Sequence, residues 1–189
     1  GGRWWCGLGR PGAGGGAVGA GWCGECVRGV GARLGVEPRR ERAHALLAST
    51  VTIHRHPLAG RNFECYPEDP FLSARMAVAY ITGVQSQGVA CTVKHFVAND
   101  SEFERMTMSS EVDERTLREI SLVPFEAAVK EAGVWALMTA YNRVTGPACS
   151  AHAQQDTMLR CDAGFNGPVA PVVSGTHRPR PAPTARPSP

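Results

Sequence analysis

The sequence lacks three features that would each mark a specialised class of protein. No apolar run reaches the ~18 residues that a membrane-spanning helix needs, and the first residues lack the basic-then-apolar pattern of a signal peptide. Acidic and basic residues are interspersed and the formal net charge is only +3, so no basic face indicates a nucleic-acid binder. Neither a membrane nor a nucleic acid is therefore expected as a partner.

A disulfide framework is also absent, because the seven cysteines are odd in number and have no repeating spacing. Scattered thiols fit a reducing compartment, so a cytoplasmic location is expected. The chain starts at Gly1 rather than Met, and an upstream targeting signal is the alternative. His54 and His56 have no carboxylate or third histidine at a supporting spacing, so a structural role is favoured and no metal or other cofactor is expected.

Both ends lack a periodic apolar pattern. Residues 1–21 are dominated by glycine, and residues 176–189 by proline, arginine and alanine. Neither composition can bury a core, so both segments are predicted to be disordered. Residues 22–175 are predicted to form a single domain, because a chain of 189 residues has room for one sizeable core.

Two short motifs near the start of the chain resemble cofactor or redox sites. Gly14, Gly16 and Gly19 fit the dinucleotide-binding pattern G-x-G-x-x-G, but no strand precedes them, so low complexity is favoured. The segment from Trp22 to Cys26 (WCGEC) resembles the redox-active WCGPC of thioredoxins, in which a helix N-terminus lowers a thiol pKa. Glycines precede the motif and Glu25 replaces the usual proline, so a thiol oxidoreductase is kept only as a distant alternative.

Between the two ends, strand and helix patterns alternate. Buried strands are predicted at 45–51, through Val89 and Val93 into the run TVKHFVAND, at 134–140 and, more weakly, at 169–173. Helical spacing separates these strands. The alternation predicts an α/β fold with a parallel sheet and right-handed crossovers.

The predicted helices carry recognisable start and stop signals. A first helix is expected from Cys26 and should break near Pro38. Asp69 and Pro70 are the expected N-cap and first residue of a second helix. Ser110 has capping-box spacing at the start of a third, which Pro124 should kink or split.

The run from Thr92 to Asp100 is where chemistry is expected. In a parallel α/β protein, functional side chains gather at the carboxyl ends of strands. Lys94 and His95 are neighbours there, so a regular strand would point them to opposite faces. A β-bulge would instead turn both toward one ligand. A solvated lysine beside a structural histidine is the simpler interpretation of these two residues by themselves.

Three longer motifs carry a resemblance to a known family: HRHPLAGRNFECYPEDPF, KHFVANDSEFERMTMSSEVDERTLREI and ALMTAYNRVTG. Their order and spacing resemble glycoside hydrolase family 3, the β-glucosidase family, over roughly Leu47 to Ser150. The resemblance implies an incomplete (β/α)8 TIM-type barrel with about half of its repeats, since a complete barrel typically has about 250 residues. It also implies hydrolysis of terminal non-reducing β-D-glycosyl residues, with a small-molecule β-glucoside or oligosaccharide as the partner.

The resemblance further implies which residues touch the sugar. The matching positions that line the family's subsite for the non-reducing-end sugar are Arg61, Lys94, His95, Met138 and Tyr141. Arginine and lysine donate hydrogen bonds to sugar hydroxyls, histidine donates or accepts them, and tyrosine adds a ring and a hydroxyl. These groups hold a sugar, but they do not break the glycosidic bond.

The residues that break the bond have no counterpart in this sequence. A retaining glycosidase uses a carboxylate nucleophile and a second carboxyl group as acid and base. The family's nucleophile is the Asp of a Ser-Asp-Trp motif, and here Ser174 is followed by Gly175. The family's acid/base Glu comes from a later part of its chain. No catalytic residue is therefore assigned, and the chain alone is expected to be inactive.

Two interpretations of this pattern differ in class. The first is a β-glucosidase-like fragment, and the alternative is a non-catalytic carbohydrate-binding or interaction fragment. The family pattern stops abruptly, and Gly, Arg, Pro and Ala dominate beyond it, as in a GC-rich gene read out of frame. We therefore hypothesise frameshifted ends. Translation of the DNA after Ser174 in the other two frames should recover the missing Asp-Trp, and a failure to find it would contradict the hypothesis.

Overall fold

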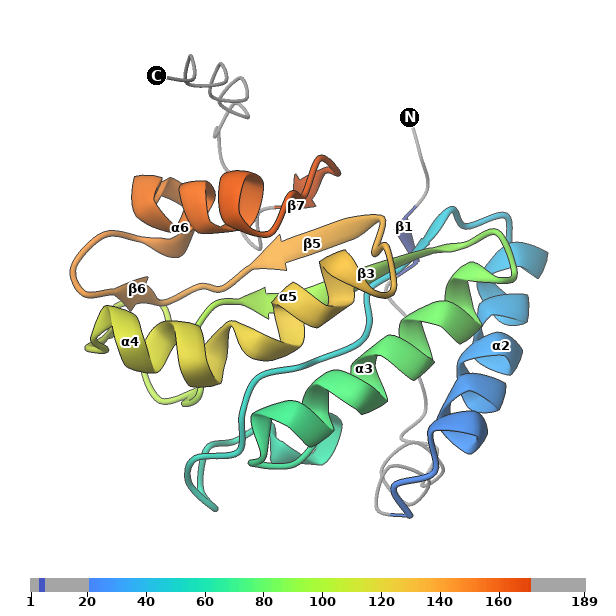
Figure 1. Ribbon diagram of the computed structural model, residues 1–189, viewed down its shortest axis with the longest axis horizontal. Helices are drawn as coiled ribbons and strands as arrows, with labels where there is room; N and C mark the ends of the chain where they lie inside the picture. Colours follow the sequence, from blue (N-terminus) through green and yellow to red (C-terminus); the bar gives the residue numbers. More distant parts are fainter. Residues whose placement is uncertain (1–3, 6–20, 171–189) are drawn as a thin grey trace.

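A parallel sheet organises the part of the chain that the computed structural model describes, residues 4–5 and 21–170 (Figure 1). Its strands lie in the order β1-β2-β3-β5-β7, and every neighbouring pair is parallel. They are β1 (Trp4–Trp5), β2 (Ala45–Leu46), β3 (Ala90–Phe96), β5 (Ala136–Thr139) and β7 (Val169–Ala170). Because neighbours in the sheet follow one another along the chain, the α/β prediction with a parallel sheet is confirmed.

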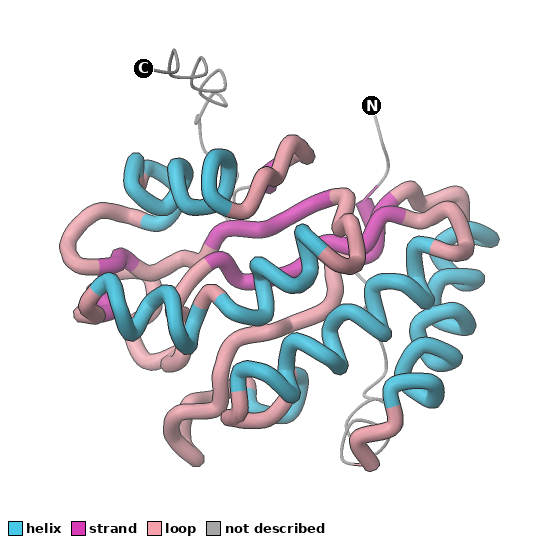
Figure 2. Tube along the Cα trace, in the orientation of Figure 1, coloured by secondary structure: helices cyan, strands magenta, loops and turns pink. Residues whose placement is uncertain are grey.

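The helices connect these strands and share one flank of the sheet. Helices α2, α3 and α5 pack against one another in chain order, as the tube in Figure 2 shows. The α-helices are α2 (Gly24–Arg40), α3 (Pro70–Gln85), α4 (Glu114–Thr116), α5 (Val123–Lys130) and α6 (Ala153–Thr157). Single π-helical turns continue α4 over Leu117–Ser121 and α6 over Met158–Asp162, and 3-10 turns occupy Asn62–Glu64 and Cys149–Ala151.

Two further strands pair outside the main sheet: β4 (Ser109–Ser110) and β6 (Arg143–Val144) form a small parallel ladder.

Among the residues described, no helix combines the length and the hydropathy needed to cross a membrane.

The hydrophobic core lies between the sheet and these helices. Ile81 and Val84 of α3 and Val93 and Leu137 of the central strands are fully buried. Full burial of such a side chain stabilises the fold by about 1.5–3 kcal/mol relative to exposure. At the end of β3, Phe96 meets Phe125 of α5 edge to face with ring centroids 5.2 Å apart. The core therefore fixes β3 and β5, the strands that lead into the polar residues considered below.

The helix boundaries differ from the prediction in two places. Pro38 does not break the first helix but lies buried near its end, where its carbonyl accepts a hydrogen bond from the Ala43 N–H at 2.8 Å. The proline removes one N–H donor from the last turn, and the helix continues for two more residues to Arg40. The third helix starts at Glu114 with Asp113 as its N-cap, whereas Ser110 lies in β4 and donates to the carbonyl of Ala98.

The other predicted boundary signals are confirmed. Asp69 caps α3, because its Oδ1 accepts a hydrogen bond from the backbone N–H of Leu72 at 2.6 Å. Pro124 lies in the first turn of α5 and separates it from the π-helical turn before it, so the predicted split occurs.

The predicted strands are longer than the observed ones. The segment 45–51 is a strand only at Ala45–Leu46, although Val51 stays fully buried and its N–H donates to the carbonyl of Lys94 at 2.8 Å. Beyond Leu46 the chain leaves the ladder, and Thr50 makes isolated bridges to Lys94 and to Cys65. The strand predicted at 134–140 covers Ala136–Thr139. Only the first two residues of the strand predicted at 169–173 are described, and they form β7.

The prediction that both ends of the chain are disordered is wrong at one place. Trp4–Trp5 lie inside the glycine-rich segment, yet they form β1 and pair with β2, because the edge of β2 offers unpaired backbone groups. Gly14, Gly16, Gly19 and residues 171–189 lie outside the described residues. The proposed domain boundaries at residues 21 and 175 therefore stay predictions.

The close packing of α2 on α3 generates a stability prediction. A Cβ added at Gly83 of α3 would lie 2.2 Å from the carbonyl oxygen of Arg28, whereas one added at Gly29 of α2 meets nothing within 4 Å. Gly83→Ala is expected to destabilise the fold by about 1–3 kcal/mol through overpacking. Gly29→Ala should be neutral or stabilising by up to about 1 kcal/mol, because alanine favours a helix. Urea unfolding of both variants measures the difference, and equal midpoints would contradict this packing.

Candidate functional site

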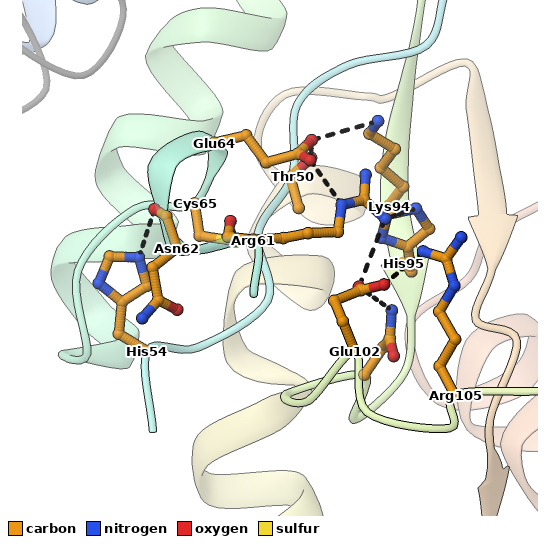
Figure 3. A network of polar contacts seen from close by, with 11 residues as sticks. Thr50, His54, Arg61, Asn62, Glu64, Cys65, Lys94, His95, Glu102 and Arg105 are labelled. Carbon is orange, nitrogen blue, oxygen red and sulfur yellow. Dashed lines mark hydrogen bonds and ion pairs between the residues drawn. The ribbon is translucent and has the colours of Figure 1, made fainter. Parts of the chain in front are cut away.

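Polar side chains from three segments meet at the carboxyl edge of the sheet (Figure 3). The first segment is the connection 54–69 before α3, the second is the end of β3, and the third is the loop 99–108 that follows β3. Neighbouring parallel strands end at the same edge, so segments that are distant in sequence are brought together there. Arg61 lies at the centre of this cluster, between Glu64 and Glu102.

Glu64 joins two cationic side chains. Its Oε1 accepts a hydrogen bond from Arg61 Nε at 2.6 Å, and its Oε2 accepts one from the Thr50 hydroxyl at 2.7 Å. The same Oε2 lies 3.4 Å from Lys94 Nζ. Both carboxylate oxygens are thus occupied by donors of the protein itself. Glu64 therefore sets the position of Arg61 relative to Lys94.

Lys94 and His95 face the same cluster, although they are neighbours on β3. Arg61 Nη1 donates to His95 Nε2 at 3.2 Å, while Lys94 contacts Glu64. The register of β3 against β5 shifts between Val93 and Phe96, so the strand is irregular at these two residues. The regular-strand interpretation is therefore wrong, and these contacts fit a β-bulge that turns both side chains toward one side; that they share a ligand stays a prediction.

Glu102 contacts Arg61 from the opposite side. Its Oε1 lies 3.5 Å from Arg61 Nη1 and accepts a hydrogen bond from Asn99 Nδ2 at 3.2 Å. Its other oxygen, Oε2, pairs with Arg105. The Arg105 guanidinium in turn stacks over the ring of Tyr141, 4.4 Å from the ring centroid. Tyr141, which follows β5, is thus joined to the cluster through Arg105 and Glu102.

Burial and charge set the protonation states in this cluster. Burial alone would raise the pKa of Glu64, but hydrogen bonds from Arg61 and Thr50 and the charge of Lys94 outweigh it and lower the pKa to about 2. Burial, reinforced by the charges of Arg61 and Lys94, lowers the pKa of His95 to about 3. Glu64 is therefore a carboxylate and His95 a neutral imidazole at neutral pH. Because Arg61 can only donate, the Nε2 atom of His95 is the acceptor.

Backbone contacts hold the loops that carry these side chains. Asn142 is fully buried, and its Nδ2 donates to the carbonyls of Ala98 at 3.1 Å and Arg143 at 2.9 Å, which joins the ends of β3 and β5. The N–H of Glu102 donates to the carbonyl of Ala59 at 2.9 Å, and Arg55 pairs with Asp100. The connection before α3 and the loop after β3 are thereby tied to each other.

The two histidines of the connection have structural partners. His54 Nε2 donates to the carbonyl of Asn62 at 3.0 Å, and His56 Nδ1 accepts from the N–H of Leu58 at 3.1 Å. Within residues 4–5 and 21–170, no group of three or more His, Cys, Asp or Glu side chains could hold a metal ion. The structural interpretation of His54 and His56 fits these contacts.

The predicted sugar-binding residues are only partly assembled into one network. Hydrogen bonds, ion pairs and the ring stack connect Arg61, Lys94, His95 and Tyr141. Met138 lies half-buried on β5, paired with Ala170 of β7, and contributes no hydrogen bond or ion pair to the network. Whether these five residues bind a sugar stays a prediction.

Sequence reasoning missed the anions that organise the site, Glu64 and Glu102. A signal for Glu64 was present, because it follows Arg61 by three residues, a spacing at which an ion pair forms within one turn. Glu102 stands at the same spacing before Arg105. Its contact with Arg61 could not be read from spacing, because the two residues are far apart in sequence.

Comparison with protein families finds similarity to one family of glycosidases. The family model described as "Glycosyl hydrolase family 3 N terminal domain" matches residues 15–174. A β-glucosidase of Rhizobium radiobacter is 57% identical over 162 residues, which are 85% of this chain and 20% of that protein. The thermostable β-glucosidase B of Acetivibrio thermocellus is 52% identical over 129 residues, or 68% of this chain and 17% of that protein.

Solved structures share the same fold. β-Glucosidase 3B from Thermotoga neapolitana in complex with α-D-glucose superimposes with a TM-score of 0.80 at 44% identity, covering 83% of this chain and 22% of that one. The family 3 β-glucosidase of Bifidobacterium adolescentis gives a TM-score of 0.82 at 35% identity, covering 87% and 24%. The partial (β/α)8 barrel is thereby confirmed. The chain spans about a fifth of the length of the curated relatives it matches.

The buried state of His95 generates a pH prediction. Its folded pKa of about 3 lies below the ordinary value of 6.5, so between these pH values the unfolded chain binds a proton that the folded chain does not. The contribution of neutral His95 to the free energy of unfolding is therefore fully present above about pH 6.5 and is lost as the pH falls toward 3. In NMR spectra, the imidazole signals of His95, assigned by their absence in His95→Gln, should not titrate between pH 8 and about 4. A midpoint near 6.5 would show that the side chain is solvated.

Proposed function

Since this chain belongs to glycosyl hydrolase family 3, we propose that it carries part of the sugar-binding subsite of a β-glucosidase. The observation that supports this best is the bridged cluster at the carboxyl edge of the sheet, in which Glu64 holds Arg61 and Lys94 side by side. Edges of this kind position ligands in parallel α/β folds. The related Thermotoga neapolitana enzyme was solved with glucose, which makes a hexose the first ligand to test.

The donors of the cluster suit sugar hydroxyl oxygens. Arg61 uses Nε and Nη1 on protein partners, and in the described part of the chain its Nη2 has no protein acceptor. Within the described residues, the Lys94 ammonium contacts Glu64 alone, and it carries three donor hydrogens. Because Glu64 is fully engaged by Arg61, Thr50 and Lys94, it acts as a positioning residue and the two cations present the remaining donors.

The charge of the cluster favours an uncharged ligand. Two carboxylates, Glu64 and Glu102, lie among three cations, Arg61, Lys94 and Arg105. Most of the positive charge is therefore neutralised within the protein. Neutral His95 adds no further charge. A neutral polyol such as a glucoside gains hydrogen bonds here, whereas an anionic ligand would have to displace the internal carboxylates.

An aromatic surface completes the proposed subsite. Tyr141 is half-buried, and the stacked guanidinium of Arg105 fixes its ring. A fixed ring offers an apolar face to the C–H side of a sugar and a hydroxyl to its rim. Met138, which lies in β5 just before Tyr141, would supply apolar contact of the same kind.

Hydrolysis itself needs groups beyond this cluster. A retaining glycosidase forms and then hydrolyses a covalent glycosyl-enzyme intermediate on a carboxylate nucleophile. The expected nucleophile position is occupied by Gly175, which lies outside the described residues. Arg61, Lys94, His95, Met138 and Tyr141 are accordingly proposed to bind and orient the sugar. A non-catalytic carbohydrate-binding fragment would use the same cluster. Activity measurements distinguish this role from that of a β-glucosidase subsite.

Glucose binding is the first test of this subsite. Glucose is expected to slow amide hydrogen exchange around residues 61, 94 and 95, because a bound sugar ties the loop to the strand end. Lys94→Ala should weaken binding by roughly tenfold or more, the usual cost of a lost hydrogen bond to a charged group. Glu64→Gln should weaken it as well, because Arg61 and Lys94 lose their common anchor.

Lys130→Ala is the matched control for this test. Lys94 and Lys130 are the only lysines in the sequence, and Lys130 is exposed on α5, where it pairs with Glu126. Its removal should leave glucose protection unchanged. If glucose protects Lys94→Ala and Lys130→Ala from amide hydrogen exchange to the same extent, the proposed subsite is wrong.

The chain alone is expected not to hydrolyse an aryl β-glucoside. Loss of the nucleophile costs many orders of magnitude in rate, whereas loss of one binding group costs far less. Release of the aryl group should therefore match that of a Lys94→Ala sample. Turnover that Lys94→Ala abolishes would instead show that another carboxylate serves as nucleophile.

A further inference from the structure

A pair of exposed cysteines lies at the N-terminus of α2. Cys23 is the N-cap of this 17-residue helix, and Cys26 follows in its first turn. Both thiols are exposed and neither forms a disulfide. Residues three apart on a helix are surface neighbours, with Cβ atoms about 5–6 Å apart. A small adjustment can therefore bring the two sulfur atoms to bonding distance.

The Cys23 thiol already contacts the backbone of Cys26. The backbone N–H of Cys26 donates to Cys23 Sγ at 3.3 Å. A hydrogen bond from the Cys26 thiol, followed by this N–H, lowers the pKa of Cys23, and the same contact raises the pKa of Cys26. The negative charge of Glu25 opposes the effect on Cys23. The arrangement favours a thiolate on Cys23 with the proton held by Cys26.

The remaining described cysteines do not share this environment. Cys65, Cys91 and Cys149 donate to backbone carbonyls inside the fold, and burial raises the pKa of each. Cys161 is exposed but has no cysteine three residues away. Within the described residues, two exposed thiols lie side by side only at Cys23 and Cys26.

We propose that Cys23 and Cys26 form a redox-active dithiol that exchanges with small disulfides of the glutathione type. The Cys23 thiolate attacks one sulfur of the small disulfide, a mixed disulfide forms, and one thiolate leaves. Cys26 then loses its proton and attacks Cys23 Sγ, which releases the second thiolate and closes the Cys23–Cys26 disulfide. The chain is oxidised by two electrons and the small disulfide is reduced to two thiols.

This site is separate from the sugar subsite. Helix α2 packs on α3 and lies at the outer end of the helical layer, while the sugar cluster lies at the strand ends (Figure 1). No residue of the Arg61 network belongs to α2. The exchange is therefore independent of the proposed β-glucosidase subsite and can be tested without any sugar. Trp22, which is 48% exposed beside Cys23, provides a fluorescence reporter for oxidation.

The test uses the full 189-residue chain, reduced and then treated with glutathione disulfide. Peptide mapping by mass spectrometry should find the loss of two hydrogens in the peptide that holds Cys23 and Cys26. Cys26→Ser should stop at a stable glutathione adduct on Cys23, and this adduct should be absent from the wild type at equilibrium. Cys161→Ser is the matched control and should form the internal disulfide as completely as the wild type.

Three results would overturn the proposal. One is failure of the wild type to form the Cys23–Cys26 bond at any ratio of oxidised to reduced glutathione. Another is an equal glutathione adduct on Cys23 in the wild type and in Cys26→Ser, which would show that Cys26 does not resolve it. The third is a disulfide from Cys6 to either residue in place of the internal one. Because both substituted positions, Cys26 and Cys161, are exposed, circular dichroism should show the same helix content in every variant.

Discussion

The polar site depends on one carboxylate, Glu64. Its two oxygens bind Arg61, Thr50 and Lys94, and these partners come from three separate stretches of the chain. The same contacts keep Glu64 ionised in a partly buried place, with a pKa of about 2. Without this anion, Arg61 and Lys94 would repel each other across a region of low dielectric. One acidic side chain thus allows two cations to lie side by side at the strand end.

The irregular end of β3 is the second constraint on the site. A regular strand would place Lys94 and His95 on opposite faces, but the register shift between Val93 and Phe96 brings both to the cluster. The hydrophobic core holds this irregular backbone in place, since Val93 and Phe96 are buried on either side of it. Packing of these two side chains in the core therefore keeps the irregular backbone of Lys94 and His95 in position.

Membership of glycosyl hydrolase family 3 provides a proposed role for the polar cluster around Arg61, but not for every reactive group of the chain. The chain covers about a fifth of its β-glucosidase relatives and contains the donor side of the proposed subsite. The exposed thiols of α2 lie outside that account, on a helix that takes no part in the network. One fold thus presents two chemically different sites, a polar cluster at the strand ends and a dithiol at a helix end.

The sequence by itself determined the α/β alternation, the N-cap of α3 at Asp69 and the split at Pro124, because these follow from local periodicity and backbone chemistry. Its family motifs also selected Arg61 and Lys94 as candidates. Tertiary structure alone decided that Lys94 and His95 share one side, and that Glu102, from a distant loop, contacts Arg61. Contacts between segments far apart in sequence leave no local pattern, because they form only when the parallel strands bring their carboxyl ends to one edge.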